Sequence, residues 1–215
     1  NPRQKRGAVN DRRVLHSEAR TSTLADMEML GKIFGSGARL KTLRLFAFNQ
    51  DVSFTLPEVA ERTKLAKDAA RREVADLLSA GFLRKKGAAA RAHYQINPRF
   101  EHLAALDTFI RETTNVRKEN ILRALRRAGT LQLVALTGLF TGIIEPQIDL
   151  LVVGDRIEER VLANAVRSLE AELGREIRYA SFATADFRYR RGVYDRLLRD
   201  VFDYPHRILI DKIGL

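Results

Sequence analysis

The sequence contains no cysteine. Disulfide bonds, thiolate zinc sites and cysteine nucleophiles are therefore excluded, and we expect a cytoplasmic protein. No uncharged apolar run approaches the roughly 20 residues that span a bilayer. The longest candidate, residues 131–144, contains Gln132 and two glycines, so we expect no membrane partner. No N-terminal apolar segment resembles a signal peptide, which agrees with the same location.

The sequence also lacks recognisable patterns for metal or cofactor binding. Its histidines do not have the close spacing of metal ligands: His16, His93, His102 and His206. It contains no glycine-rich phosphate loop and no evident serine, histidine and aspartate arrangement. We therefore expect no metal and no cofactor.

Positive charge is abundant and unevenly distributed. The net charge is +11 at pH 7. Residues 1–22 hold six basic side chains against two acidic ones, and residues 36–100 hold thirteen against six. Residues 131–215 are nearly balanced, with twelve against thirteen. Charge concentrated in one half favours a nucleic-acid partner, although a solvated basic face is the alternative interpretation.

The first 35 residues precede the regular part of the sequence. Residues 1–22 are polar and without periodicity, which predicts a flexible basic arm that contacts DNA phosphates or is simply a disordered end. A short helix is expected within residues 23–35, ending at Gly31 or Gly35.

Residues 36–100 predict three helices followed by a β-hairpin. Ser36 caps a helix over residues 38–48, and Thr55 with Glu58 forms a capping box for the second helix. Apolar positions spaced i, i+4, i+7 and i+8 predict the third helix over residues 67–80, ended by Gly81. Two β segments, residues 82–86 and 93–96, then flank a short loop.

This order of elements resembles the winged helix-turn-helix domain of bacterial and archaeal regulators. The run Leu-x-x-Ala-Gly-Phe-Leu at residues 77–83 and the closing Asn97-Pro98-x-Phe100 carry the resemblance. The resemblance implies a DNA-binding domain over residues 23–100, with double-stranded DNA as the partner. Many such regulators bind as two-fold dimers, so a homodimer is expected.

The elements that approach DNA in that fold carry several basic residues. On the third helix, Lys67, Arg71 and Arg72 would enter the major groove, where arginine recognises guanine. The alternative is a solvated helix face stabilised by Asp68 and Glu73. Around the hairpin loop, basic side chains would contact phosphates. They are Arg84, Lys85, Lys86 and Arg91.

Residues 101–129 predict one linking helix, which is a candidate dimerisation element. Residues 113–115 (Thr-Thr-Asn) are a place where it could be interrupted. After Gly129 the pattern changes to alternating strands and helices. Strands are expected over residues 131–136, 148–153, 177–182 and 207–210, and helices over residues 157–173 and 186–202. The second of these helices would be built around apolar residues that include Phe187 and Tyr194.

Residues 130–215 resemble the nucleotidyltransferase domain of the DNA polymerase beta superfamily, without its catalytic residues. In that family a Gly-Ser turn holds a phosphate, and an Asp-x-Asp pair on the next strand holds Mg²⁺. Here the turn is Gly138-Leu139 and the pair is Gln147-x-Asp149. The third carboxylate of the family has Arg178 as its candidate replacement. Two metal ions about 4 Å apart need carboxylates at fixed spacing, so we expect no catalysis.

Asp149 itself has two interpretations. It is a structural residue, for example a partner of Arg178, or it keeps a role as a ligand in a degenerate nucleotide site formed with Gly138 and Gln147.

Together these features predict an α+β protein with an N-terminal winged helix-turn-helix domain, a linking helix and a C-terminal nucleotidyltransferase-like domain containing a small mixed sheet. The expected function is a DNA-binding transcriptional regulator. Its C-terminal domain would serve dimerisation, a protein partner or the sensing of a ligand such as a nucleotide. An active nucleotidyltransferase acting on a small molecule, RNA or protein is an alternative, as is an antitoxin-like interaction module.

Overall fold

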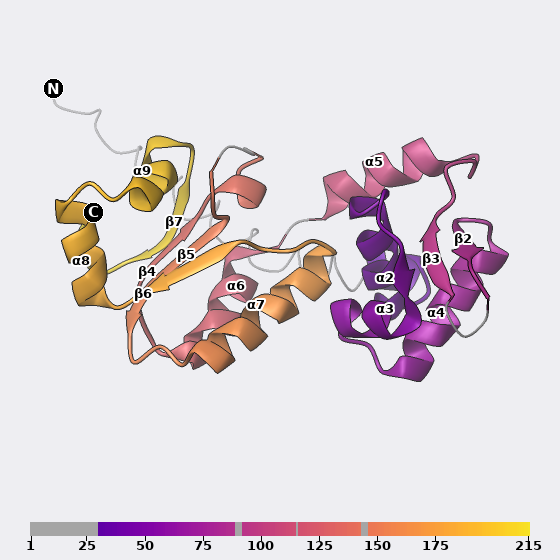
Figure 1. Cartoon of the computed structure of the whole chain (residues 1–215), viewed down its shortest axis with the longest axis horizontal. Helices are drawn as coiled ribbons and strands as arrows, with labels where there is room; N and C mark the ends of the chain where they lie inside the picture. The colour runs from indigo at the N-terminus through magenta and orange to yellow at the C-terminus, as the bar shows by residue number, and fades with distance from the viewer. Residues whose placement is uncertain (1–29, 89–91, 115, 143–145) are drawn as a thin grey trace, which may run out of the picture.

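The computed structural model describes residues 30–88, 92–114, 116–142 and 146–215. The chain combines helices with two small sheets, as the predicted α+β class requires. The elements form two groups, each with its own buried apolar residues (Figure 1). We call residues 36–114 the N-terminal unit and residues 116–215 the C-terminal unit. Ahead of the N-terminal unit, residues 30–33 are helical, and this helix ends before Gly35, whose φ is +86°. The expected start of this helix lies outside the described residues.

The N-terminal unit contains three helices, a hairpin and a fourth helix. One short strand, β1, was not expected from the sequence. It pairs with β3, so the sheet has the antiparallel order β1-β3-β2. The elements are α2 (Gly37–Phe48), β1 (Phe54–Thr55), α3 (Leu56–Thr63), α4 (Lys67–Ser79), β2 (Leu83–Lys86), β3 (His93–Ile96) and α5 (Leu103–Thr113).

Local capping sets the helix boundaries of this unit. The Ser36 hydroxyl accepts a hydrogen bond from the backbone N–H of Arg39 at 2.9 Å, which begins α2. Thr55 and Glu58 form the expected capping box at the start of α3. Gly81 follows the last turn of α4 with a φ of +76°, a conformation that glycine adopts without steric cost. The predicted helix boundaries are therefore correct to within one residue.

The linking segment forms two helices and not one, and the first of them ends at Thr113, where the sequence indicated an interruption. After α5, a second helix α6 (Lys118–Leu125) runs into the 3₁₀ turn η3 (Arg126–Ala128). The hydroxyls of Thr113 and Thr114 donate to the carbonyl oxygens of Phe109 and Ile110, each at 2.6 Å. These side-chain hydrogen bonds lie in the last turn of α5. The helix ends there because the backbone of Thr114 is extended.

The two helices of this segment belong to different units. Ile110 of α5 packs into the apolar cluster of the N-terminal unit. Ile121 and Leu125 of α6 pack into the C-terminal unit. A continuous exposed helix that could pair with a second copy is therefore absent from the described part of this segment.

The C-terminal unit is a four-stranded mixed sheet covered by helices. Its strand order is β6-β5-β4-β7, and only β5 and β6 run parallel. The elements are β4 (Thr130–Leu136), the 3₁₀ turn η4 (Gly138–Phe140), β5 (Leu150–Asp155), α7 (Glu159–Leu173), β6 (Tyr179–Phe182), α8 (Thr184–Gly192), α9 (Arg196–Asp203) and β7 (Arg207–Asp211).

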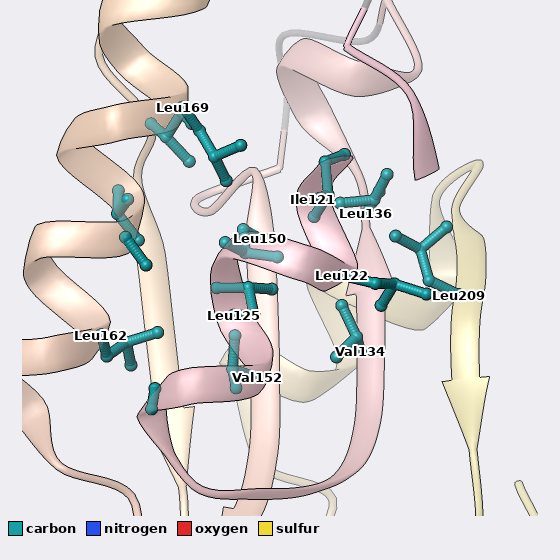
Figure 2. Packing of buried hydrophobic residues seen from close by; sticks show 14 of the residues in the cluster. Ile121, Leu122, Leu125, Val134, Leu136, Leu150, Val152, Leu162, Leu169 and Leu209 are labelled. Atoms are coloured by element: carbon teal, nitrogen blue, oxygen red, sulfur yellow. The ribbon is translucent and has the colours of Figure 1, made fainter. Parts of the chain in front are cut away.

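Both faces of this sheet are buried because the apolar residues of its central strands alternate between them. Val134 of β4 and Val152 of β5 face α6 and α7, whereas Leu133 and Val153 face α8 and α9. Figure 2 shows the first face, where leucines of α6 and α7 meet Leu150 and its neighbours. The near-continuous apolar run at residues 148–153 thus reflects a central strand covered on both sides.

The predicted helix over residues 186–202 is also two helices, which corrects a second boundary. Tyr194 lies between α8 and α9 with a φ of +55°. Its side chain is 81% exposed, so the prediction that it belongs to the core is wrong. Asp195 then caps α9 by accepting from the backbone N–H groups of Leu197 and Leu198. Phe187, by contrast, is buried as expected. None of the described helices is long and apolar enough to span a membrane.

Candidate nucleic-acid interface and the joint between the units

The three basic residues predicted on the third helix lie together on the exposed face of α4. Lys67, Arg71 and Arg72 are all exposed, whereas Ala70 and Val74 on the opposite face are buried. Arg71 makes one ion pair, with Asp68 at 3.5 Å, and both side chains are largely in solvent. An exposed pair of this kind contributes little free energy, so it does not prevent Arg71 from binding an anion.

Glu73 does not stabilise this basic face, contrary to the alternative interpretation of the sequence. It is buried and points back to the start of α2. Its carboxylate accepts from the Ser36 hydroxyl at 2.9 Å and from Nε of Arg39 at 2.7 Å. The hydrogen bond with Glu73 raises the pKa of Arg39 above its ordinary value, against the effect of burial. Glu73 is thus used to fix α4 against α2, and the acidic side chain beside the basic face is Asp68, whose pair with Arg71 is solvated.

The hairpin adds further exposed cations next to this helix. Arg84, Lys85 and Lys86 follow one another along β2 and are exposed. Arg84 donates to the Gln95 side chain on β3, at a long distance of 3.4 Å. Within the described residues no carboxylate pairs with Lys85 or Lys86. Arg91, the remaining predicted contact, lies outside the described residues. Figure 1 shows β2 packed beside α4, on the side of the N-terminal unit away from the C-terminal unit.

The residues predicted to form a degenerate nucleotide site contain an internal ion pair. Asp149 lies just before β5, and its side chain is only 4% exposed. Its carboxylate accepts two hydrogen bonds from the Arg178 guanidinium, at 2.8 and 3.0 Å. It also accepts from the backbone N–H groups of Leu139 at 2.7 Å and Arg178 at 2.9 Å. The interpretation of Asp149 as a partner of Arg178 is therefore correct.

These four bonds use the accepting capacity of the Asp149 carboxylate. Burial alone would raise the pKa of Asp149, but the hydrogen bonds from Arg178 and from both N–H groups outweigh it and hold that pKa below its ordinary value. The carboxylate is thus charged at neutral pH but directed entirely to the protein. No group of three possible metal-binding side chains occurs among the described residues.

Gly138 and Gln147 do not complete a ligand site around Asp149. Gly138 has a φ of +50°, and a Cβ placed on it would lie 2.2 Å from Oδ1 of Asp149. The glycine is therefore needed for the close approach of the carboxylate to the turn. Gln147 is exposed, whereas Asp149 is buried. The structure brings together Gly138, Asp149 and Arg178 and leaves Gln147 apart.

A polar joint connects the two units, and sequence reasoning missed it. Arg44 of α2 is 2% exposed and donates to the Thr114 hydroxyl and to the carbonyl oxygen of Glu172, each at 3.0 Å. Gly174, which ends α7, lies directly on the backbone of Arg44, where a Cβ would approach within 2.5 Å. Asn49 donates to the carbonyl oxygen of Gly174 at 2.8 Å.

The signal for this joint is faint in the sequence. Arg44 stands between Leu43 and Leu45 in α2. Apolar residues occur on every side of this helix, which is typical of a buried helix. The buried partner of such a helix lies more than 120 residues away along the chain, and local periodicity does not identify it.

Basic side chains extend along the same joint. Lys64, in the turn between α3 and α4, donates to the Asn164 carbonyl oxygen at 3.0 Å and to the Ser168 hydroxyl at 2.8 Å on α7. Arg111 and Arg175, one from each unit, both lie over the ring of Phe48, at 5.1 and 5.3 Å from its centroid. The C-terminal unit therefore holds the N-terminal unit through α2 and α3 while α4 and β2 stay uncovered.

Comparison with known proteins adds no assignment, since no family model, no curated protein and no solved structure matches this chain.

Proposed function

We propose that this protein is a DNA-binding transcriptional regulator whose N-terminal unit acts as a winged helix-turn-helix domain. The observation that carries the proposal is the row of exposed cations on α4 and β2, two elements that pack side by side. Only Arg71 among them has an ion-pair partner within the described residues, and that pair is solvated. Unneutralised cations on adjacent elements suit the closely spaced phosphates of a duplex.

Within this proposal the elements have different tasks. Lys67, Arg71 and Arg72 on α4 contact the major groove, where arginine forms two hydrogen bonds to guanine. Lys85 and Lys86 on β2, with Arg84 and Arg91, bind phosphates and so position the domain. The proposed partner is double-stranded DNA, bound by a homodimer.

The C-terminal unit is proposed to be non-catalytic and to serve a partner or a ligand. The bonds between Asp149 and Arg178 support this proposal, because they use the carboxylate that a nucleotide site of the predicted kind would need for Mg²⁺. A two-metal reaction would require those bonds to break and a second carboxylate to replace Gln147. Incubation with labelled nucleotide and Mg²⁺ tests this part: transfer that disappears in Asp149→Ala would overturn it.

Fluorescence anisotropy with labelled duplex DNA tests the main proposal. We expect the double variant Lys85→Ala/Lys86→Ala to bind every duplex more weakly, by roughly tenfold or more, because it loses phosphate contacts. Arg71→Ala and Arg72→Ala should in addition change which fragments are selected from random duplex DNA, with about 1–3 kcal/mol of discrimination lost for each base contact.

The control variant is Arg188→Ala/Arg196→Ala, which removes the same charge from exposed sites of the C-terminal unit. It should bind DNA almost as the unchanged protein does. Equal weakening in both double variants would reduce the effect to net charge and contradict the proposed interface. Absence of DNA affinity together with co-purification of one specific protein would favour an interaction module instead.

A further inference from the structure

A large cavity lies between the two units, apart from both α4 and the Asp149 site. Its volume is about 1190 Å³, somewhat above the roughly 300–1,000 Å³ of most small-molecule sites. One wall is formed by α2 and the residues just before it, and the other by α6 and α7. A molecule bound there would touch both units at once.

The polar lining of this cavity is strongly basic. Six cationic side chains line it, and among the described residues Glu172 is the one acidic side chain in the lining. Glu172 is already paired with Lys41 at 2.7 Å. Arg123 and Arg127 are exposed on successive turns of α6 and η3 and have no ion pair within the described residues. The six are Lys32, Lys41, Arg44, Lys64, Arg123 and Arg127.

Arg44 adds a buried positive charge beside the cavity. Its Nη2 is buried and has no hydrogen-bond partner, although Nε and Nη1 are both satisfied. A buried guanidinium donor without a partner is costly, and burial lowers the pKa of Arg44. The negative charge of Glu172 opposes this shift but does not cancel it, so the lining of the cavity keeps a surplus of positive charge.

Apolar side chains form another part of the lining and indicate an apolar part of the ligand. Leu40 faces the cavity from α2, and Val161, Ala165 and Leu169 face it from α7. A simple inorganic anion would leave this wall unused, because an ion of that size gains nothing from apolar contact. Residues 1–22 of the chain are an unsuitable occupant, since they are themselves basic and the lining would repel them.

We propose that the cavity between the two units binds an organic phosphate: a small molecule whose phosphoryl groups meet Arg123 and Arg127, beside the buried charge of Arg44, while its apolar body lies along α7. This inference goes beyond DNA binding and does not depend on it. Because the ligand contacts both walls, its binding free energy also stabilises the joint between the units.

Isothermal titration calorimetry of the full chain without divalent metal tests the proposal, with ATP, AMP and glucose 6-phosphate as probes and inorganic triphosphate as the charge control. At least one organic phosphate should bind with one-to-one stoichiometry and at least about tenfold more tightly than triphosphate. Arg127→Ala should weaken that binding about tenfold or more, the effect of losing one charged hydrogen bond.

Arg126→Ala is the matched control, because Arg126 is the exposed neighbour of Arg127 and is not part of the lining. It should leave the affinity within about twofold. Binding by none of the three organic phosphates would overturn the proposal. Equal weakening by Arg126→Ala and Arg127→Ala would also overturn it, since attraction to net charge alone gives that result.

Discussion

Asp149 is almost excluded from solvent, yet it remains charged because four donors surround its carboxylate. Two of the donors are backbone N–H groups, one in the turn after β4 and one just before β6. The side chain therefore joins three segments of the sheet that are distant in sequence. At this scale the residue is a structural anchor, and Gly138 provides the space that it needs.

Replacing Asp149 by asparagine should lower the free energy of unfolding at pH 7 by about 1–3 kcal/mol. The amide has one oxygen in place of two, so the donors that now bond to the second oxygen lose their acceptor. Since the pKa of Asp149 is lower in the folded protein than in the unfolded chain, its contribution is complete above the unfolded-state pKa. That contribution is lost as the pH falls through the folded-state value. Urea unfolding of both proteins at neutral and acidic pH measures the difference.

The matched control is Asp51→Asn, in the exposed turn after α2. Its unfolding free energy should stay close to that of the unchanged protein at each pH. A difference between Asp149→Asn and the unchanged protein that does not shrink in acid would contradict the role of the charged carboxylate.

The capping box of α3 shows how short-range contacts define an element. The Glu58 carboxylate accepts from the Thr55 backbone N–H at 2.6 Å and from its hydroxyl at 2.8 Å. The hydrogen bond from the Thr55 backbone lowers the pKa of Glu58. The helix that starts here ends at Lys64, which contacts α7, so its placement also affects the joint.

Thr55→Ala should destabilise the protein by about 1 kcal/mol, because the start of α3 loses its side-chain cap. Chemical denaturation followed by circular dichroism measures the change. Thr55→Ser keeps the hydroxyl and should recover most of the loss. An alanine variant as stable as the unchanged protein would show that the packing of α3 against α4 and α7 suffices without the cap.

At the scale of the whole molecule, the joint orients the N-terminal unit so that α4 and β2 point away from the C-terminal unit (Figure 1). If this face binds DNA, the logarithm of the association constant should fall linearly with the logarithm of salt concentration, with a slope of about −0.9 per phosphate neutralised. Anisotropy titrations between low and moderate salt measure the slope. Binding that does not respond to salt would contradict an interface built on these cations.

Much of the fold follows from short stretches of sequence. The caps at Ser36 and Thr55 and the ends at Gly81 and Gly174 involve residues at most four positions apart, so their patterns are directly visible. The break after Thr113 falls where the polar run Thr113-Thr114 indicates one. The break at Tyr194 was harder to predict, because the apolar pattern continues across it. The two-residue strand β1 exists through its pairing with β3, about 40 residues later, and has no pattern of its own.

The sequence by itself determined the α+β class, most element boundaries and the basic first half, since these depend on local spacing and composition. Only the tertiary structure decided that Asp149 is bound to Arg178, that Glu73 faces α2, and that Arg44 lies in a joint beside a basic cavity. Those contacts join residues that are 29 to 128 positions apart. Their partners are chosen by the packing of whole elements, which local periodicity does not specify.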